Sequence, residues 1–328
     1  MTDPTIDVVG IGNALVDVIS HEHPEFIASQ GLVPGSMNLI DDDRRSALYA
    51  SMGVGVETSG GSVANTTVGV TSFGGTAHYL GRVRNDQLGE VFAHDIRAAG
   101  VGYSNSLATE GPATGCCLVL VTPDGQRTMN TYLGAAELFG PDDVDPDAVR
   151  SGGILYLEGY LFDRPPAQEA FRFAAEVAHQ ANRTVSITLS DSFCVDRHRD
   201  DFRDLLAGHV DLLFANEAEL CSLYEVDDVE VAIKAVAGDV PLAVVTRSEH
   251  GSVVLRRGER TDIAVVPVQE VVDSTGAGDL YAAGFLYGLA RGYDLATCGA
   301  LGSIGAAEII AHVGPRPEVQ LSTIAKGL

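Results

Sequence analysis

The chain has 328 residues, enough for one large domain with an inserted element or for two domains. Its 45 acidic residues against 21 basic ones give a formal charge of −24, which argues against nucleic acid or an anionic membrane as a partner. No apolar run approaches the roughly 18 residues of a membrane-spanning helix, and the N-terminus lacks a basic and apolar signal region. We therefore expect a soluble, cytoplasmic protein. The 5 cysteines fit neither a disulfide framework nor a metal-binding spacing, so we expect mostly buried thiols.

Short apolar runs alternate with longer amphipathic segments along the chain. The pattern predicts strands at residues 6–11, 77–80, 154–157, 184–189, 210–214 and 243–246. It predicts helices at residues 44–52, 62–73, 86–99, 167–180, 200–206, 229–237 and 280–290. This alternation is typical of a mostly parallel α/β sheet flanked by helices, in which ligands bind at the carboxyl ends of the strands.

Two stretches, residues 14–40 and 114–133, interrupt the alternation. The second contains a Thr-Pro-Asp-Gly turn between two strand-like runs, which predicts a hairpin. We expect both stretches to form one small β-sheet lid, which leaves residues 1–13, 41–113 and 134–328 as the core. The alternative is that these stretches add strands to the main sheet. A lid can exclude water from a reaction site.

Residues 273–279 read Asp-Ser-Thr-Gly-Ala-Gly-Asp and precede an apolar helix. The first free N–H groups of that helix come from Gly276, Ala277 and Gly278, and such a helix start attracts anions. A carboxylate at Asp279 would be repelled by a bound phosphate unless it takes a proton from a hydroxyl that attacks a phosphoryl group. The alternative is an ordinary capped helix of the core.

Two polar positions near the N-terminus suit a sugar ring. Asn13 and Asp17 lie four residues apart after the first predicted strand, and their amide and carboxylate can bind vicinal hydroxyls. A turn-forming asparagine and a solvated aspartate are the alternative. The run begins Gly-x-Gly but lacks the third glycine of a dinucleotide fingerprint, which argues against an NAD-dependent oxidoreductase.

A second glycine turn lies at the start of the helix predicted at residues 62–73. Gly60 and Gly61 let a ligand approach the backbone, and Asn65 lies one turn inside the helix, pointing to the same cavity. A helix start without a ligand is the alternative.

The Gly-Gly-x-x-x-Asn run and the run at residues 273–279 resemble, in this order, the two signatures of the PfkB carbohydrate kinase family, the ribokinase-like kinases that include adenosine kinases. The resemblance implies a ribokinase-like fold, with Asp279 as catalytic base and the turn at residues 276–278 binding the transferring phosphate. It implies that Gly60, Gly61 and Asn65 contact the sugar. It also implies that Asn13 and Asp17 hold ribose.

The resemblance extends to a nucleotide side. Asn216 and Glu219 match the family motif Asn-x-x-Glu, which implies that Glu219 organises Mg²⁺ through water; the alternative is an ordinary helix start. Thr246, Ser248 and Gly251 match a nucleotide-binding pattern in part, because Ser248 replaces its middle glycine. The implied cofactors are ATP and Mg²⁺.

A monovalent-cation site, for K⁺, is an optional part of the resemblance. Asp273, Thr275 and the loop that ends at Gly314 align with the residues that form such a site in ribokinase. Arg127, after the predicted turn of the lid, is either a surface arginine or a residue that reaches a phosphate when the lid closes.

Four apolar residues of the predicted lid favour a nucleoside as substrate, with adenosine first, because they could sandwich a purine: Leu15, Met37, Cys117 and Leu133. A sugar kinase acting on ribose, fructose or a keto-deoxy sugar acid is the alternative. A non-catalytic nucleoside or sugar sensor is a remote alternative, because Asp279 and the glycine turn are intact. The chain is expected to be a monomer or a homodimer joined through its lids.

Overall fold

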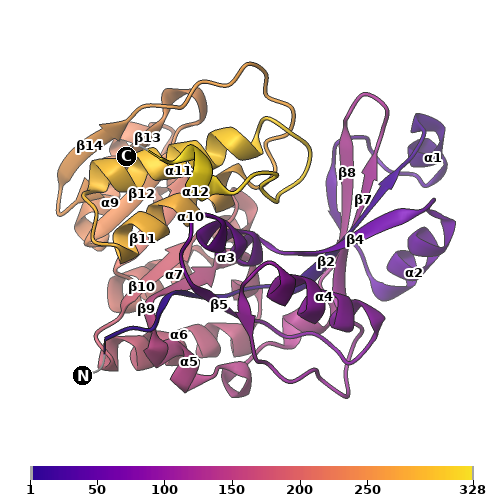
Figure 1. Cartoon of the computed structure of the whole chain (residues 1–328), viewed down its shortest axis with the longest axis horizontal. Coiled ribbons are helices and arrows are strands. Elements are labelled where there is room, and N and C mark those ends of the chain that lie inside the picture. Colours follow the sequence, from indigo (N-terminus) through magenta and orange to yellow (C-terminus); the bar gives the residue numbers. More distant parts are fainter. Residues whose placement is uncertain (1–2, 327–328) are drawn as a thin grey trace.

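The computed structural model describes residues 3–326 and contains two β-sheets (Figure 1). The large sheet has nine strands, in the spatial order β14 (Glu259–Ile263), β13 (Ser252–Arg256), β12 (Leu242–Thr246), β11 (Leu212–Asn216), β10 (Thr184–Thr188), β9 (Gly152–Glu158), β1 (Ile6–Ile11), β5 (Ala77–Leu80) and β6 (Gly102–Tyr103). Neighbouring strands from β12 to β6 run parallel, as predicted, whereas β13 and β14 add an antiparallel hairpin at one edge. The alternation of strands and helices does not predict this hairpin, because no helix separates its two strands.

Helices cover both faces of the large sheet. One face packs against α3 (Ser62–Ser72), α4 (Gln87–Ala98), α10 (Ala277–Ala290), α11 (Leu295–Ile309) and α12 (Leu321–Ile324). The other face packs against α5 (Pro146–Ser151), α6 (Pro165–Gln180), α7 (Ser192–His209), α8 (Glu217–Tyr224) and α9 (Val229–Asp239). Along β9, Ile154 and Tyr156 enter the first core and Leu155 and Leu157 the second. A strand buried on both faces is apolar throughout, which is why these strands appear as continuous apolar runs in the sequence.

The small sheet lies beside the large one (Figure 1), in the spatial order β3 (Met37–Leu39), β8 (Arg127–Tyr132), β7 (Gly115–Val121), β2 (Leu15–His21) and β4 (Gly55–Gly60). The predicted hairpin is confirmed as β7 and β8, and the Gly125 amide donates to the Thr122 carbonyl at 2.8 Å. The small sheet is therefore separate, and the alternative of extra strands in the main sheet is wrong.

The predicted boundary between the two parts needs correction. Residues 41–60 were expected in the core, but β4 pairs with β2, and α2 (Asp42–Ser51) packs on β7 and β8 beside α1 (Pro24–Ser29) of the same region. The small sheet therefore draws on residues 15–60 as well as 115–132. Most of β4 is exposed or half-buried and contains two glycines, so it lacks a clear two-residue alternation. Residues 1–2 and 327–328 of the expected core lie outside the described residues.

Four short 3₁₀ helices, η1 (Gly134–Leu138), η2 (Pro141–Asp143), η3 (Gly159–Asp163) and η4 (Ser248–His250), connect these elements. The helix predicted at residues 200–206 is the second half of α7, which has a non-helical residue at His198.

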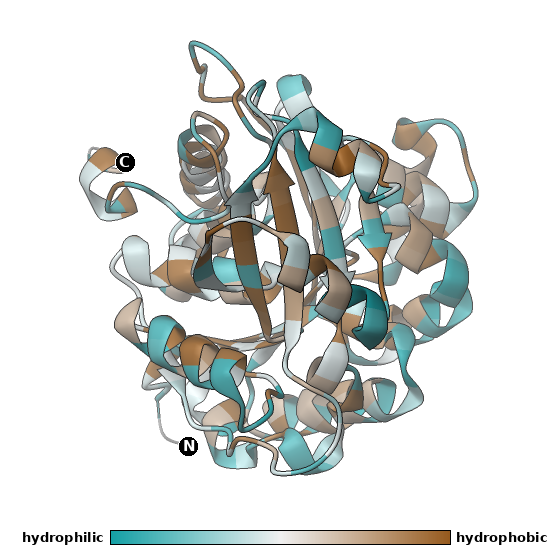
Figure 2. Cartoon of the chain, turned by 90° about the vertical axis from the view of Figure 1, so that its right-hand side faces the viewer, coloured by the Kyte–Doolittle hydropathy of each residue, from teal (hydrophilic) through white to brown (hydrophobic). Residues whose placement is uncertain are grey.

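The helices in view in Figure 2 carry both hydrophilic and hydrophobic colours, whereas two strands at the centre are almost wholly hydrophobic. All 5 cysteines are free, and only Cys221 is not fully buried. Among residues 3–326, no helix has the length and apolar character that crossing a membrane requires.

Helices α3 and α10 pack closely, and Gly69 lies where they meet. A Cβ atom at Gly69 would lie 2.5 Å from the Ala283 Cβ and 2.7 Å from a Leu280 methyl carbon. The two helices can therefore pack this closely only because Gly69 has no side chain.

We predict that Gly69→Ala lowers the free energy of unfolding. Overpacking costs about 1–3 kcal/mol, which exceeds the helix-propensity gain of about 1 kcal/mol. The control is Gly238→Ala in α9, where no atom lies within 4 Å of the new Cβ, and which should leave stability unchanged or higher. Denaturant unfolding of both variants tests the packing; equal stability of the two would contradict it.

Candidate active site

A cleft of about 630 Å³ lies between the carboxyl ends of the large sheet and the small sheet. Most of the residues selected from the sequence line it, namely Asn13, Asp17, Gly61, Asn65, Asn216, Glu219, Thr246, Thr275, Gly276, Ala277, Gly278 and Asp279. Gly60, Ser248, Gly251, Asp273 and Gly314 are not part of this lining. Segments far apart in the sequence are thus brought to one site, as expected for the carboxyl edge of a parallel sheet.

The Asp279 carboxylate lies at the start of α10 and is held by α3. Ser62 Oγ donates to one of its oxygens at 2.6 Å, and Asn65 Nδ2 donates to the other at 3.0 Å. Burial raises the pKa of Asp279 to about 6, although these two hydrogen bonds work against the rise. At neutral pH the group is therefore a carboxylate that can accept a proton. Ser62 was not selected from the sequence, although it follows the Gly60-Gly61 turn directly.

The turn before α10 presents free backbone N–H groups. Gly276 caps the helix with a φ of 82°, a left-handed conformation that favours glycine, and no side chain of residues 3–326 caps the helix. The Ala277 amide, expected to be free, donates to the Ser274 carbonyl at 3.2 Å, because the turn closes on itself there. Among the described residues, no acceptor is present for the Gly278 and Asp279 amides. A Cβ at Gly278 would meet no atom within 4 Å, so this residue faces open space in the cleft. These features fit an anion at the helix N-terminus.

The expected sugar-binding residues lie together beside Asp279. Asp17 is 9% exposed and lies so close to the last residue of β4 that a Cβ at Gly60 would lie 2.6 Å from its carboxyl carbon. Burial raises the pKa of Asp17 to about 6. Gly61 has a φ of 103°, and a Cβ there would collide with the Asn13 carbonyl oxygen. The two glycines thus let β4, β2 and the end of β1 converge.

Glu158, which was not selected from the sequence, organises this region. It is 1% exposed at the end of β9, and it accepts from Asn13 Nδ2 at 2.8 Å, from the Asn13 amide at 3.1 Å and from the Val63 amide at 3.0 Å. Burial raises its pKa to about 7. The sequence does carry a signal for Glu158, since it is an acid at the end of a buried strand. That strand is parallel to the strand before Asn13, so both strands end at the same edge of the sheet.

Asn216 and Glu219 form a reciprocal cap at the start of α8. The Glu219 amide donates to Asn216 Oδ1 at 2.8 Å, and the Glu219 carboxylate accepts from the Asn216 amide at 3.0 Å and from Asn216 Nδ2 at 2.6 Å. The ordinary helix start and the expected motif thus coincide. Burial raises the pKa of Glu219 to about 7, and Asp191 and Asp279 add to the rise.

The negative charges of Asp191 and Asp279 act on Glu219, and Mg²⁺ is a cation that would offset this excess of negative charge. Each carboxylate oxygen of Glu219 accepts one hydrogen bond and retains a lone pair for a water ligand. In the part of the chain that the structure describes, no group of three or more His, Cys, Asp and Glu could hold a metal ion. Mg²⁺ keeps several waters and binds phosphate oxygens, so one acid is chemically sufficient.

Thr246 ends β12 at the cleft, whereas Ser248 and Gly251 form a turn behind it. Ser248 has a φ of 50°, so the serine adopts the left-handed backbone that a glycine would adopt more easily. Between them, Arg247 pairs with Glu217 at 2.7 Å and with Glu230 at 3.1 Å. The serine thus has a backbone conformation that is typical of glycine.

Asp273 is paired with Arg127 of the small sheet. It also accepts from the Thr275 amide at 2.9 Å and the Gly314 amide at 3.1 Å. Burial works to raise the pKa of Asp273, but the contacts with Thr275, Gly314 and Arg127 hold it below its usual value. Because Arg127 already balances this charge, the residues present do not call for a resident cation; the K⁺ site stays a prediction from the resemblance.

Arg316 is a buried cation that the sequence motifs do not reveal. It follows α11, and it donates to the Ala64 carbonyl at 3.2 Å, the Ser59 carbonyl at 2.5 Å and Ser59 Oγ at 3.0 Å. Its charge lowers the pKa values of Asp17 and Asp279. A single guanidinium thus joins the end of β4 to the start of α3. An isolated arginine in a proline-flanked loop carries no sequence signal for this role.

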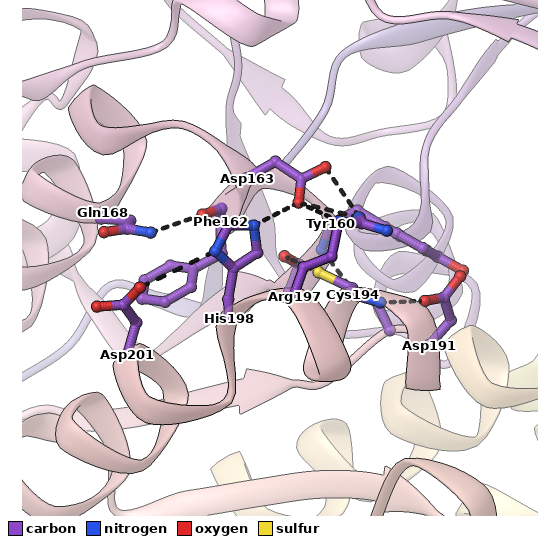
Figure 3. Close-up of polar contacts among 11 residues, drawn as sticks. Tyr160, Phe162, Asp163, Gln168, Asp191, Cys194, Arg197, His198 and Asp201 are labelled. Carbon is purple, nitrogen blue, oxygen red and sulfur yellow. Dashed lines mark hydrogen bonds and ion pairs between the residues drawn. The ribbon is translucent and has the colours of Figure 1, made fainter. Parts of the chain in front are cut away.

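The rest of the cleft wall is largely apolar. It includes the four residues expected from the sequence, Leu15, Met37, Cys117 and Leu133, and it adds Leu39, Val119, Met129, Tyr160 and Phe193. Beside Tyr160 lies a polar group in which Asp163 binds Arg197 and His198 (Figure 3).

Comparisons with known proteins agree with this geometry. Residues 35–320 match the family model described as the pfkB family carbohydrate kinase. Adenosine kinase of Saccharomyces cerevisiae is 28% identical to this chain, over 95% of this chain and 96% of the yeast chain. The crystal structure of adenosine kinase from Sinorhizobium meliloti is 49% identical over 98% of both chains, with a TM-score of 0.90. A probable sugar kinase from Rhizobium etli is 48% identical over 98% of both chains, with a TM-score of 0.91.

The family model covers most of the chain, and the fold is that of the ribokinase-like kinases. The members of this family transfer a phosphoryl group from ATP to a hydroxyl group. With the signature turn, the acid beside it and the separate small sheet all in place, the chain belongs to the PfkB family of carbohydrate kinases.

Proposed function

We propose that this protein is a nucleoside kinase that transfers the γ-phosphoryl group of ATP to a primary hydroxyl, with adenosine as its preferred acceptor. The observation that carries the proposal is the position of Asp279. A carboxylate with a pKa of about 6 is the third residue of α10, in the first turn of a helix with free N–H groups, and is aligned by Ser62 and Asn65. A base beside an anion site is what phosphoryl transfer to a hydroxyl requires.

In the proposed reaction, Asp279 accepts the hydroxyl proton while the hydroxyl oxygen forms a bond to the γ-phosphorus. The bond between that phosphorus and the leaving oxygen of ADP breaks in line. The N–H groups of Gly278 and Asp279, which have no acceptor among the described residues, offset the charge on the transferring group. Asn65 Oδ1 is buried and has no partner among the described residues, so it is available to accept from a substrate hydroxyl. Asn13 and Asp17 would bind the remaining hydroxyls.

The nucleotide would bind along Asn216, Thr246 and the turn at residues 276–278, where the strand ends and α10 meet. Glu219 would hold Mg²⁺ through water, and the metal would supply positive charge to the phosphates. Asp273, Thr275 and Gly314 would form the monovalent-cation site that the resemblance implies. Ser248 and Gly251 would shape the turn behind the nucleotide.

The apolar cleft wall favours a nucleoside over a free sugar. Three of its side chains remain largely exposed, with Met37 at 51%, Leu39 at 63% and Phe193 at 72%. A planar base would cover such side chains, whereas a sugar has no apolar ring to offer them. The adenosine kinases among the relatives support the same choice, and the sugar kinases among them supply the alternative.

The small sheet fits the lid expected from the sequence, because its residues form one wall of the cleft. Cytoplasmic localisation stays a prediction, as does the choice between a monomer and a homodimer joined through the small sheets.

We predict that, with Mg-ATP, adenosine is phosphorylated with a higher kcat/KM than ribose, fructose or a keto-deoxy sugar acid. The physical reason is the burial of apolar area by the base, worth about 25 cal/mol for each Å². A coupled assay of ADP release across this panel measures it. If ribose is the best substrate, the assignment is reversed. If no acceptor of the panel gives ADP release, the kinase activity on these acceptors is contradicted.

We predict that Asp279→Asn lowers kcat by about 100-fold or more, the usual range for general-base help. Asparagine has nearly the same shape but cannot take the proton. The melting temperature and the affinity for ATP should change little. Turnover close to that of the unaltered protein would rule out the role of Asp279.

We predict that Gly278→Ala raises the KM for ATP about tenfold or more, because the methyl group would stand over N–H groups whose charge-assisted hydrogen bonds are worth about 1.5–3 kcal/mol. The fold should be retained, since a Cβ at Gly278 meets no atom within 4 Å. The matched variant is Gly276→Ala, which places a Cβ 3.1 Å from Pro315 at a φ of 82° and should lower the melting temperature instead. An unchanged KM for ATP in Gly278→Ala would place the phosphates elsewhere.

A further inference from the structure

A charged pair lies in the cleft wall, near the apolar side chain of Phe193 and near the carboxylate of Asp191, whose charge acts on Arg197. Asp163 ends η3, Arg197 lies on α7 one turn after Phe193, and all three residues line the cleft. Arg197 donates to Asp163 through Nε at 3.2 Å and through Nη2 at 3.0 Å to both carboxylate oxygens. His198 Nε2 lies 2.7 Å from the same carboxylate (Figure 3). The family motifs assign nothing to this pair.

The pair leaves one donor and one acceptor unused. Arg197 Nη1 has no acceptor among the described residues, and Asp163 Oδ2 accepts only from Arg197 Nη2 there. The Arg197 side chain is 49% exposed and that of Asp163 is 24% exposed, so both are accessible from the cleft. His198 and Arg197 together fix the carboxylate, so the free donor and the free acceptor belong to two side chains that are held together by hydrogen bonds.

The surroundings fit a flat ring with a polar edge. The exposed ring of Phe193 lies on the same face of α7 as Arg197, and Tyr160 lies beside Asp163 (Figure 3). Exposed apolar side chains of the small sheet, Met37 and Leu39, line the same cleft. Pockets for small molecules commonly combine apolar walls with a few polar groups that fix orientation.

An exposed ion pair adds little to stability, typically about 0–1 kcal/mol. Its position in the wall of a ligand cleft therefore has more consequence for binding than for folding. A free donor next to a free acceptor is complementary to an acceptor next to a donor. The edge of a 6-aminopurine has this arrangement, with ring nitrogen N1 beside the exocyclic amino group.

We propose that Asp163 and Arg197 are specificity-determining residues that bind the hydrogen-bonding edge of the base. This inference rests on the proposed nucleoside kinase activity. The substrate class is a nucleoside whose base carries an exocyclic polar group next to a ring nitrogen. Purine riboside, which has hydrogen in place of that amino group, cannot donate to Asp163 and should be the poorer substrate.

The test measures kcat/KM for adenosine and for purine riboside in the unaltered protein and in Asp163→Leu, which removes the acceptor for the amino group. The expected result is a loss of about tenfold or more for adenosine, the value of one charge-assisted hydrogen bond, with purine riboside changed by less than about threefold. Arg197→Met keeps the aliphatic stem but removes the donor to N1, which both substrates carry, so it is expected to lower kcat/KM about tenfold for both. An equal loss for both substrates in Asp163→Leu, or no loss for either substrate in either variant, would overturn the inference.

The matched control is Arg199→Met on the same helix. Arg199 binds the Ser222 carbonyl, Asp196 and Glu225 and does not line the cleft, so kcat/KM for both nucleosides should be unchanged. A loss of about tenfold in this control would count against the inference. If the unaltered protein phosphorylates neither nucleoside, the proposed function itself fails. If it phosphorylates adenosine and Asp163→Leu keeps the preference for adenosine, only the role of the charged pair fails.

Discussion

The structure depends on keeping several carboxylates buried around one cleft. Asp17, Glu158, Glu219 and Asp279 all have pKa values raised by burial, to between about 6 and about 7. Removing a charge from water is costly unless hydrogen bonds or an opposite charge replace the lost solvation. Two of these acids, Glu158 and Glu219, accept hydrogen bonds from backbone amides at the ends of strands and the starts of helices. They therefore hold the backbone in the shape that the cleft needs.

The other two acids, Asp17 and Asp279, are the ones available to a substrate. Their pKa values are raised by burial and lowered by the charge of Arg316, which contacts neither through a hydrogen bond but lies close enough to act on both. A base must be deprotonated near neutral pH and still bind a proton readily, and a pKa of about 6 meets both conditions. The remaining negative charge, near Glu219, is what a divalent cation with its phosphate ligands would neutralise.

The sequence predicts those parts of the site that come from local patterns. The strands of the large sheet, except the edge hairpin and the short β6, lie within two residues of their predicted positions, because strands buried on both faces are apolar throughout. Twelve of the residues selected from motifs line the cleft, because the motifs lie at strand ends and helix starts that meet at the carboxyl edge of the parallel sheet. Glu158 and Arg316 were missed because their roles depend on contacts across 95 to 257 residues of sequence. The strand β4 was missed because its residues are half-exposed and do not alternate.

The strand β4 and Arg316, which the sequence does not predict, set the position of the small sheet relative to the large one. Asp17 lies on the small sheet, whereas Asp279 belongs to the core, so a substrate hydroxyl can meet both only if the two parts are held at the right spacing. The chain crosses between them at Gly60 and Gly61, where there is room for no side chain. Arg316 joins the Ser59 carbonyl on one side of this crossing to the Ala64 carbonyl on the other, while Ser59 is itself bound by Asp95 at 2.7 Å through its amide and at 2.6 Å through its hydroxyl. The same arginine therefore fixes the spacing of the two acids and balances their charge, which couples the position of the small sheet to the electrostatics of the base.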